Sequence, residues 1–285
     1  MEQGMGMKGH VNEPWQCSVQ EGVPLAAREL IWEVFFKSRG RGSTDLTTHY
    51  PWIDEKAGVT SILIKPGRGP EYAPAVATLL IKEEILADNK KLGLVGFVCV
   101  NEALRGNGVG HDLVSTAIEV GKDKSFDMLV LWTNKPDVYV KHGFAVDSED
   151  WYGNVWKRAE HRTGHPFCHD LSGLRIDDIS PLGIPAFAKR VLLFSNDTAS
   201  ITVLQTNQGY TLAAWSGNWD AVFQIIEQIL PDNWNLNAPA NSDIYTNLES
   251  HGFGFEFAVG SQRMINRLAS KDKLCLPYIP LLKRI

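Results

Sequence analysis

The stretch LRGNGVGHDLV, residues 104–114, constrains the fold of this 285-residue chain more than any other. Gly106, Gly108 and Gly110 stand at alternate positions, directly after Arg105 and before a segment with the apolar spacing of a helix. Glycines permit backbone conformations and close approaches that side chains forbid. A helix that begins behind them offers unpaired N–H groups and the positive end of its dipole. The stretch therefore predicts a loop that binds phosphate through its main chain.

Three kinds of phosphate loop can be compared with this stretch. A Walker loop needs Lys-Ser or Lys-Thr after its last glycine, and His111-Asp112 stands there instead. A dinucleotide fingerprint needs G-x-G-x-x-G directly after a strand of a parallel sheet, whereas this pattern is G-x-G-x-G and follows strands joined by hairpin-length loops. The third kind holds the pyrophosphate of a coenzyme that lies along a strand end, and it fits best. A glycine-rich turn without a ligand is the structural alternative.

Hydrophobic periodicity predicts a mixed order of helices and strands around the loop. Helices are expected at 24–38, 109–124 and 136–144, and strands at 59–65, 75–86, 92–100, 126–133 and 151–158. The connection at 87–91 is short enough for an antiparallel hairpin. The sequence therefore predicts an α/β protein of the α+β type with a mixed sheet.

The polar segment 161–170 is broken by Gly164 and Pro166, which predicts a linker. It also carries possible zinc ligands, namely His161, His165, Cys168 and His169. Metal sites rarely lie on so broken a stretch with a single cysteine, so the linker is favoured and no metal is expected.

Beyond this linker the order of elements repeats. A helix is expected at 180–196, an antiparallel pair at 199–215 and a helix at 218–233. The segment 244–257 echoes 138–146, because each carries a tyrosine followed by His-Gly-Phe. These similarities predict an internal duplication. The second copy has WSGNWD, with the single glycine Gly217, where the first has its arginine and three glycines.

Two motifs together resemble the GNAT superfamily of acyl-CoA-dependent N-acyltransferases. The first is a valine-rich strand ending at Val100, followed by Arg105, Gly106 and Gly108, and the second runs from Tyr139 to Gly143-Phe144. The resemblance covers residues 15–160 well and the second half faintly. It implies two tandem GNAT-like domains: a flexible tail at 1–14, a catalytic domain at 15–160, the linker at 161–170 and a degenerate supporting domain at 171–285. Glu102 departs from the family pattern, which often has proline there.

The resemblance also implies roles for individual residues. Acetyl-CoA or another acyl-CoA would be bound by Val98, Val100, Arg105, Gly106, Asn107, Gly108, Val109, Gly110 and Asn134. Tyr139 would be the general acid that protonates the departing thiolate. A packed aromatic ring is the structural alternative at this position.

The general base and the acceptor pocket are less well marked in the sequence. Glu84, or its neighbour Glu83, is the candidate base, with solvated surface charges or a water chain to a remote acid as alternatives. His49 and Trp52, beside Tyr50, are expected to line the acceptor pocket, although a surface histidine is an equal possibility.

Composition limits the partners. A net charge of -5 argues against nucleic-acid binding, and no segment approaches the roughly 20 apolar residues of a membrane span. The N-terminal residues lack the apolar core of a signal peptide, and four scattered cysteines fit reduced thiols in the cytoplasm. We expect a cytoplasmic monomer or homodimer that transfers an acyl group to a small-molecule amine. The alternative is a non-catalytic acyl-CoA sensor or scaffold on the same fold.

Overall fold

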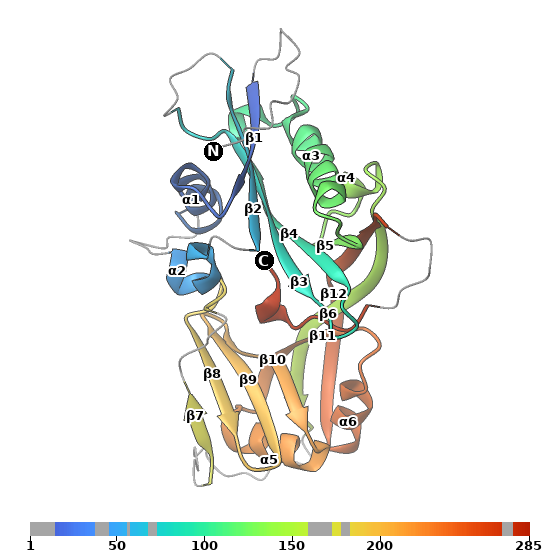
Figure 1. The fold of residues 1–285 in the computed structure, drawn as a ribbon. Helices are drawn as coiled ribbons and strands as arrows, with labels where there is room; N and C mark the ends of the chain where they lie inside the picture. Colours follow the sequence, from blue (N-terminus) through green and yellow to red (C-terminus); the bar gives the residue numbers. More distant parts are fainter. Residues whose placement is uncertain are drawn as a thin grey trace.

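A computed structural model describes residues 15–37, 46–55, 58–67, 73–158, 173–177, 183–269 and 276–285. The described residues form one continuous 12-stranded sheet in the order β1-β2-β3-β4-β5-β12-β6-β11-β10-β9-β8-β7. Helices cover both faces at one end of this sheet, and α5 (Trp219–Ile229) and α6 (Ile244–Ser250) lie at the other end (Figure 1). The predicted tail at 1–14 and the predicted linker at 161–170, with its histidines and Cys168, lie outside the described residues.

The first half begins with an antiparallel meander. Its strands are β1 (Trp15–Glu21), β2 (Val59–Pro66), β3 (Ala77–Ile85) and β4 (Lys91–Val100). These strands are almost continuously apolar because both faces of the sheet are covered. Leu79 and Ile81 pack in the cluster under α3 (Val109–Asp123), whereas Leu80 packs in the cluster under α1 (Leu25–Ile31). The strands predicted at 59–65, 75–86 and 92–100 are thus confirmed.

Short helical segments complete the two layers of the first half. A π-helical segment, η1 (Trp32–Phe36), continues α1, and α2 (Leu46–His49) and the 3-10 segment η3 (Pro51–Asp54) follow. On the α3 side lie the 3-10 segment η4 (Glu102–Leu104), α4 (Asp137–Val140) and the strand β5 (Met128–Thr133). In the described part of the chain, the helices are too short or too polar to cross a membrane.

The parallel strands β4 and β5 separate after a short contact. Leu92–Leu94 pair with Met128–Val130, and the parallel ladder ends there. Further along β4 the register with β3 shifts between Thr78 and Leu80, and Phe97 has a positive φ of 50°. This bulge turns β4 away from β5. A gap in the ladder therefore opens beside residues 95–100, just before the glycine loop.

The second half repeats this arrangement. Its elements are β7 (Arg175–Asp177), β8 (Arg190–Ser195), β9 (Ala199–Thr206), β10 (Gly209–Gly217), α5 (Trp219–Ile229), β11 (Asn233–Pro239) and α6 (Ile244–Ser250). Again a parallel pair is short, Thr211–Leu212 with Asn235–Leu236, and again a bulge follows, between Leu212 and Ala214. The predicted duplication is confirmed.

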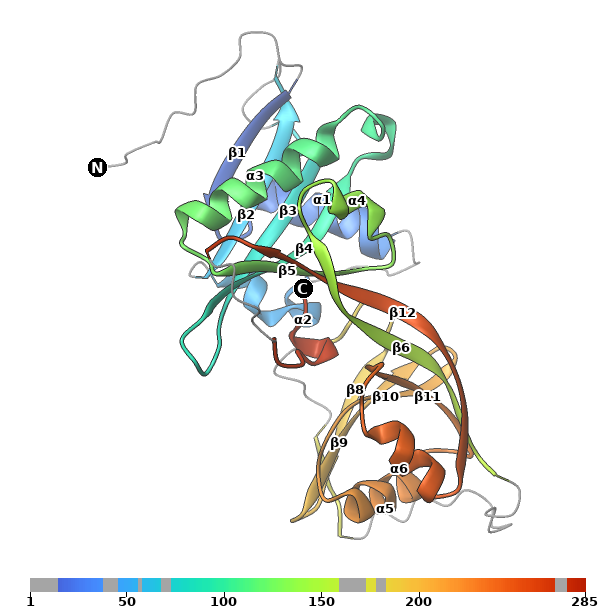
Figure 2. The same cartoon turned by 90° about the vertical axis from the view of Figure 1, so that its right-hand side faces the viewer.

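The two halves exchange their last strands. β12 (Phe253–Arg267) lies between β5 and β6 (Ala145–Lys157), and pairs with β5 through Gln262–Arg267. β6 lies between β12 and β11, and pairs with β11 through Asp150–Trp156. The two strands run together from one half to the other as a long antiparallel ribbon (Figure 2). Each half therefore needs a strand of the other half to complete its sheet.

Two predictions about the second half need correction. Residues 190–195, expected within a helix at 180–196, form β8, where Val191 and Phe194 are buried and the strand pairs with β9. Short apolar runs do not distinguish helix from strand by periodicity alone. The assignment of all residues from 171 to 285 to a separate domain is also wrong, because the end of β12 and Leu276 and Ile279 pack with the first half.

The exchange predicts that the two halves lose structure together. Phe223 is buried in the core of the second half, so Phe223→Ala should lower the free energy of unfolding by about 3–5 kcal/mol. Hydrogen exchange followed by mass spectrometry should then show lost protection in β5 of the first half as well. Gln224→Ala, on the exposed side of the same helix, is the control. Unchanged protection of β5 would show that the halves unfold independently.

Candidate active site

The glycine loop presents main-chain donors to open space. Gly106 and Gly108 have positive φ values of 82° and 85°, and a Cβ at either position would have no atom within 4 Å. Within the described residues, the amides of Gly106, Gly108, Val109 and Gly110 have no hydrogen-bond acceptor. Gly108 is the N-cap of α3 and supplies no side-chain cap. The end of this helix is therefore left free for an anion.

Arg105 lies across the end of β4 at the edge of the loop. Its Nε donates to the carbonyl of Val100 at 3.3 Å, and its Nη1 lies 3.8 Å from Glu102. The side chain of Asn101 accepts from the amide of Ala103 at 3.1 Å and fixes the η4 turn. The guanidinium remains largely exposed, so it can reach a phosphate beside the loop. Asn107 is exposed within the same loop.

The gap between β4 and β5 leads from the loop to the bulge. Val98 and Val100 are half-buried on the α3 side of β4, and Asn134 is exposed one residue beyond β5. The predicted coenzyme-binding residues thus lie along one path, from the loop to the place where the strands part. On the other face, a Cβ at Gly96 would overlap the main chain and side chain of Ile285.

Tyr139 lies on α4 and packs against the same core cluster as Val98 and Val100. Its ring meets that of Phe144 edge-on, with centroids 6.0 Å apart. Burial raises the pKa of the Tyr139 hydroxyl above its usual value, so this group stays protonated at neutral pH. The turn after α4 is held from the exchanged strand, because Asn266 donates from Nδ2 to the carbonyl of His142 at 2.8 Å.

Glu84 is not brought to this site. The β3–β4 register places it opposite Leu92, whereas Leu80 lies opposite Gly96 beside the bulge. Four residues of strand separate Glu84 from Leu80, about 13 Å at 3.3 Å per residue. Glu83 faces elsewhere and pairs with Lys91 at 3.0 Å. The strand position predicted for the base is therefore on the wrong end of β3.

His49 and Trp52 belong to an aromatic cluster that packs around Phe97. Trp52 is 9% exposed, and its ring centroid lies 6.3 Å from that of Phe97. Tyr50 meets Phe97 edge-on at 4.8 Å. His49 is a structural link, since its Nδ1 lies 2.6 Å from the carbonyl of Ile184 and its ring lies 4.7 Å from that of Phe36. The cluster forms an apolar wall on the face of β4 that Ile285 also contacts.

In the second copy, the helix that corresponds to α3 does not begin with a free end. The side chain of Asn218 caps α5 by accepting from the amides of Asp220 and Ala221, at 2.9 and 3.4 Å. A side chain at Gly217 would overlap the carbonyl of Thr198. An acidic residue in the first turn does not distinguish the two helices, because Asp112 occupies that turn of α3. The two helices differ instead in their N-caps, because a side chain caps α5 and no side chain caps α3.

Comparison with known proteins agrees with this geometry. Residues 25–144 match the model of the Acetyltransferase (GNAT) family. This part of the chain is a GNAT domain. The match includes the bulged strand, the glycine loop and Tyr139-to-Phe144, and the family's members are acetyltransferases. No curated protein matches the sequence.

Several solved structures share the fold of this chain across both of its halves. A GCN5-related N-acetyltransferase from Kribbella flavida has a TM-score of 0.59 at 10% identity, over 90% of this chain and 72% of that one. A probable N-acyltransferase from Enterococcus faecalis has a TM-score of 0.60 at 8% identity, over 89% and 73%. A tandem GNAT protein from the clavulanic acid biosynthesis pathway has 0.52 at 11% identity, over 90% and 100%. At these identities the likeness is one of fold: two tandem GNAT domains.

Several residues around the GNAT site were not predicted from the sequence. Phe97 gave no signal, because its positive φ depends on the bulge. Asn266, Arg284 and Ile285 lie far along the chain and reach the site only through the strand exchange.

The loop predicts a sharp test of coenzyme A binding. In Gly108→Trp the indole would fill the open space at the helix end, so calorimetry should show no coenzyme A binding while circular dichroism stays native. Gly173→Trp is the matched control, because Gly173 also has a positive φ, 76°, and open space around it. Equal affinity in both variants would exclude the loop as the binding site.

Proposed function

We propose that the protein transfers an acyl group, most simply acetyl, from acyl-CoA to the primary amine of a small molecule. The observation that carries this proposal is the set of unpaired amides at Gly106 and at residues 108–110, beside the gap between β4 and β5. These amides and Arg105 would hold the pyrophosphate. The main chain of residues 97–100 would pair with the pantetheine arm as an added strand does.

Direct attack by the amine accounts for the groups at the bulge. The amine nitrogen bonds to the thioester carbon, the carbon–sulfur bond breaks, and the nitrogen gives up a proton to water. The departing thiolate takes a proton from the Tyr139 hydroxyl, which solvent restores. A covalent acyl-cysteine is disfavoured on β4, because burial raises the pKa of the Cys99 thiol to about 12.

The aromatic wall supports a small acceptor with a ring. Tyr50 is half-buried at the edge of this cluster, whereas Phe97 and Trp52 are each only 9% exposed behind it. The Tyr50 ring is therefore the part of the wall that can contact a sugar or an aromatic ring of the acceptor. We therefore propose nucleotide-linked amino sugars as the first class of acceptor to test. Neither Cys17 nor Cys99 forms a disulfide within the described residues, which is compatible with a cytoplasmic protein. We propose that it acts as a monomer or homodimer.

An acceptor panel tests the activity. Acetyl-CoA should release free thiol in the presence of at least one amine from a set containing a uridine-diphosphate amino sugar, glucosamine, spermidine, phenethylamine and a lysine peptide. Mass spectrometry should show the acylated amine. Tight coenzyme A binding without transfer to any of them would favour the sensor or scaffold and contradict the enzyme.

Replacement of the proposed acid should affect turnover and spare binding. Tyr139→Phe keeps the ring and loses the proton, so kcat should fall by about 10²–10⁴-fold while coenzyme A affinity is unchanged. Tyr245→Phe is the control, since Tyr245 is the tyrosine of the second copy. Its hydroxyl donates to the carbonyl of Ala238 at 3.3 Å. If Tyr139→Phe kept the wild-type turnover, Tyr139 would have a packing role and would not be the acid.

The pH profile checks the same assignment. Because the pKa of Tyr139 is raised, its deprotonation should cause no loss of turnover below about pH 10. An alkaline loss near pH 8 that disappears in Tyr139→Phe would contradict the raised pKa.

A further inference from the structure

The segment 276–285 crosses the face of β4 opposite α3. Leu276 and Ile279 are 4% and 5% exposed, packed against Leu92, Leu94 and Met128. At its far end, the main chain of Ile285 occupies the space beside Gly96. This contact comes one residue before the bulge at Phe97, where β4 has already parted from β5. The segment therefore borders the proposed reaction centre on its acceptor side.

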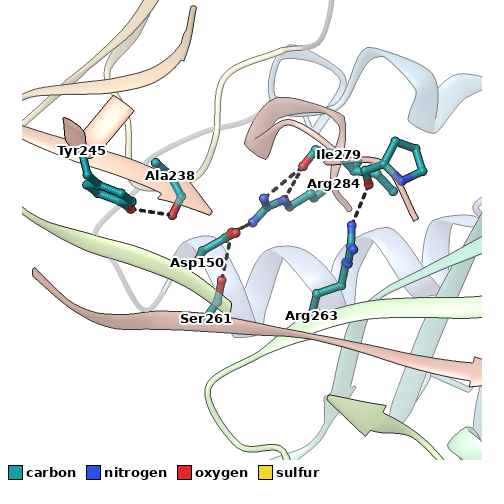
Figure 3. Close-up of polar contacts among 8 residues, drawn as sticks. Asp150, Ala238, Tyr245, Ser261, Arg263, Ile279 and Arg284 are labelled. Atoms are coloured by element: carbon teal, nitrogen blue, oxygen red, sulfur yellow. Dashed lines mark hydrogen bonds and ion pairs between the residues drawn. The ribbon is translucent and has the colours of Figure 1, made fainter. Parts of the chain in front are cut away.

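Buried charges fasten this segment to the exchanged strands. Arg263, on β12, donates from Nη1 to the carbonyl of Pro277 at 2.7 Å (Figure 3). It also donates from Nη2 to the carbonyl of Leu276 at 3.2 Å and pairs with Asp147. Arg284 donates from Nε and Nη2 to the carbonyl of Ile279, both at 3.0 Å. The guanidinium of Arg284 also pairs with Asp150.

Asp150 occupies a special place in the ribbon. It is 3% exposed and lies on β6 opposite Ser261 of β12, where the register of the two strands shifts between Val259 and Ser261. The Oγ of Ser261 approaches its carboxylate at 3.5 Å (Figure 3). The Arg284 guanidinium lies over the ring of Trp132, 4.6 Å from its centroid. The Asp150–Arg284 pair therefore links three parts of the structure, namely the β6–β12 ribbon, Trp132 on β5 and the end of segment 276–285.

Apolar contacts alone could hold the segment on the sheet. A buried ion pair is rarely more stable than apolar side chains of the same volume, whereas its fixed geometry specifies one arrangement. Here the arrangement that it specifies is the position of Ile285 beside the bulge.

We infer that segment 276–285 is the acceptor-side wall of the transfer site and that Asp150 and Arg284 are its positioning residues. The inference rests on the proposed acyl transfer. It assigns the second half of the chain a part in the first half's site, because the strands that hold the wall are those that the halves exchange. The pair acts through residues 276–285 and need not touch either substrate.

Three variants test the inference with acetyl-CoA and the best amine of the panel. Asp150→Asn should lower kcat about tenfold to a hundredfold, since small misplacements in a site have effects of this size, while coenzyme A affinity is unchanged. Asp150→Leu with Arg284→Met removes both charges, so its melting temperature should exceed that of the single variant while kcat stays low. Asp197→Asn, which breaks the exposed pair with Arg175, is the control.

The outcomes separate positioning from stability. Wild-type kcat in the double variant, or equal loss of coenzyme A binding and turnover in Asp150→Asn, would overturn the inference. If Asp150→Asn does not fold, the double variant decides. If the wild type acylates no amine, the proposed function fails instead, and hydrogen exchange tests the positioning. Faster exchange in 276–285 of either variant supports it, and unchanged exchange overturns it.

Discussion

Pairing between β6 and β12 is the interaction on which the rest of the structure depends. These strands pair along their length, from Ala145 with Ile265 to Lys157 with Phe253. In the sheet, β12 lies between β6 and β5 of the first half, and β6 lies between β12 and β11 of the second half. Neither half has a complete sheet without the other, which is the reason we expect the two halves to lose structure together. The start of α5 in the second half is capped by Asn218, yet the second half is still required because it supplies β12 to the first.

The site depends on this exchange from two sides. On the α3 side, Asn266 of β12 holds the turn that follows Tyr139. On the other side, Arg263 of β12 and Asp150 of β6 hold segment 276–285 against β4. The segments on both sides of the gap between β4 and β5 are thus held by residues of the same β6–β12 ribbon. Local features supply the rest, namely the bulge at Phe97 and the uncapped start of α3.

Features that depend on neighbouring residues could be predicted from the sequence, whereas features that depend on contacts between distant residues could not. The open loop at Gly106 and Gly108 was predictable because the glycine pattern is local, and the spacing from Tyr139 to Phe144 identified the helix after β5. Glu84 was misplaced because its distance from the bulge depends on strand register. Asp150 and Arg284 were not found, since they meet across 134 residues only after the strands are exchanged.

The central claim is that the uncapped start of α3 and the gap beside it form the acyl-CoA site. A crystal structure of the complex with coenzyme A tests it most directly. The account predicts pyrophosphate oxygens at about 3 Å from the amide nitrogens of Gly106–Gly110, the pantetheine arm between β4 and β5, and nothing bound at α5. A coenzyme bound elsewhere, or with its phosphates at the Asn218-capped end of α5, would contradict it.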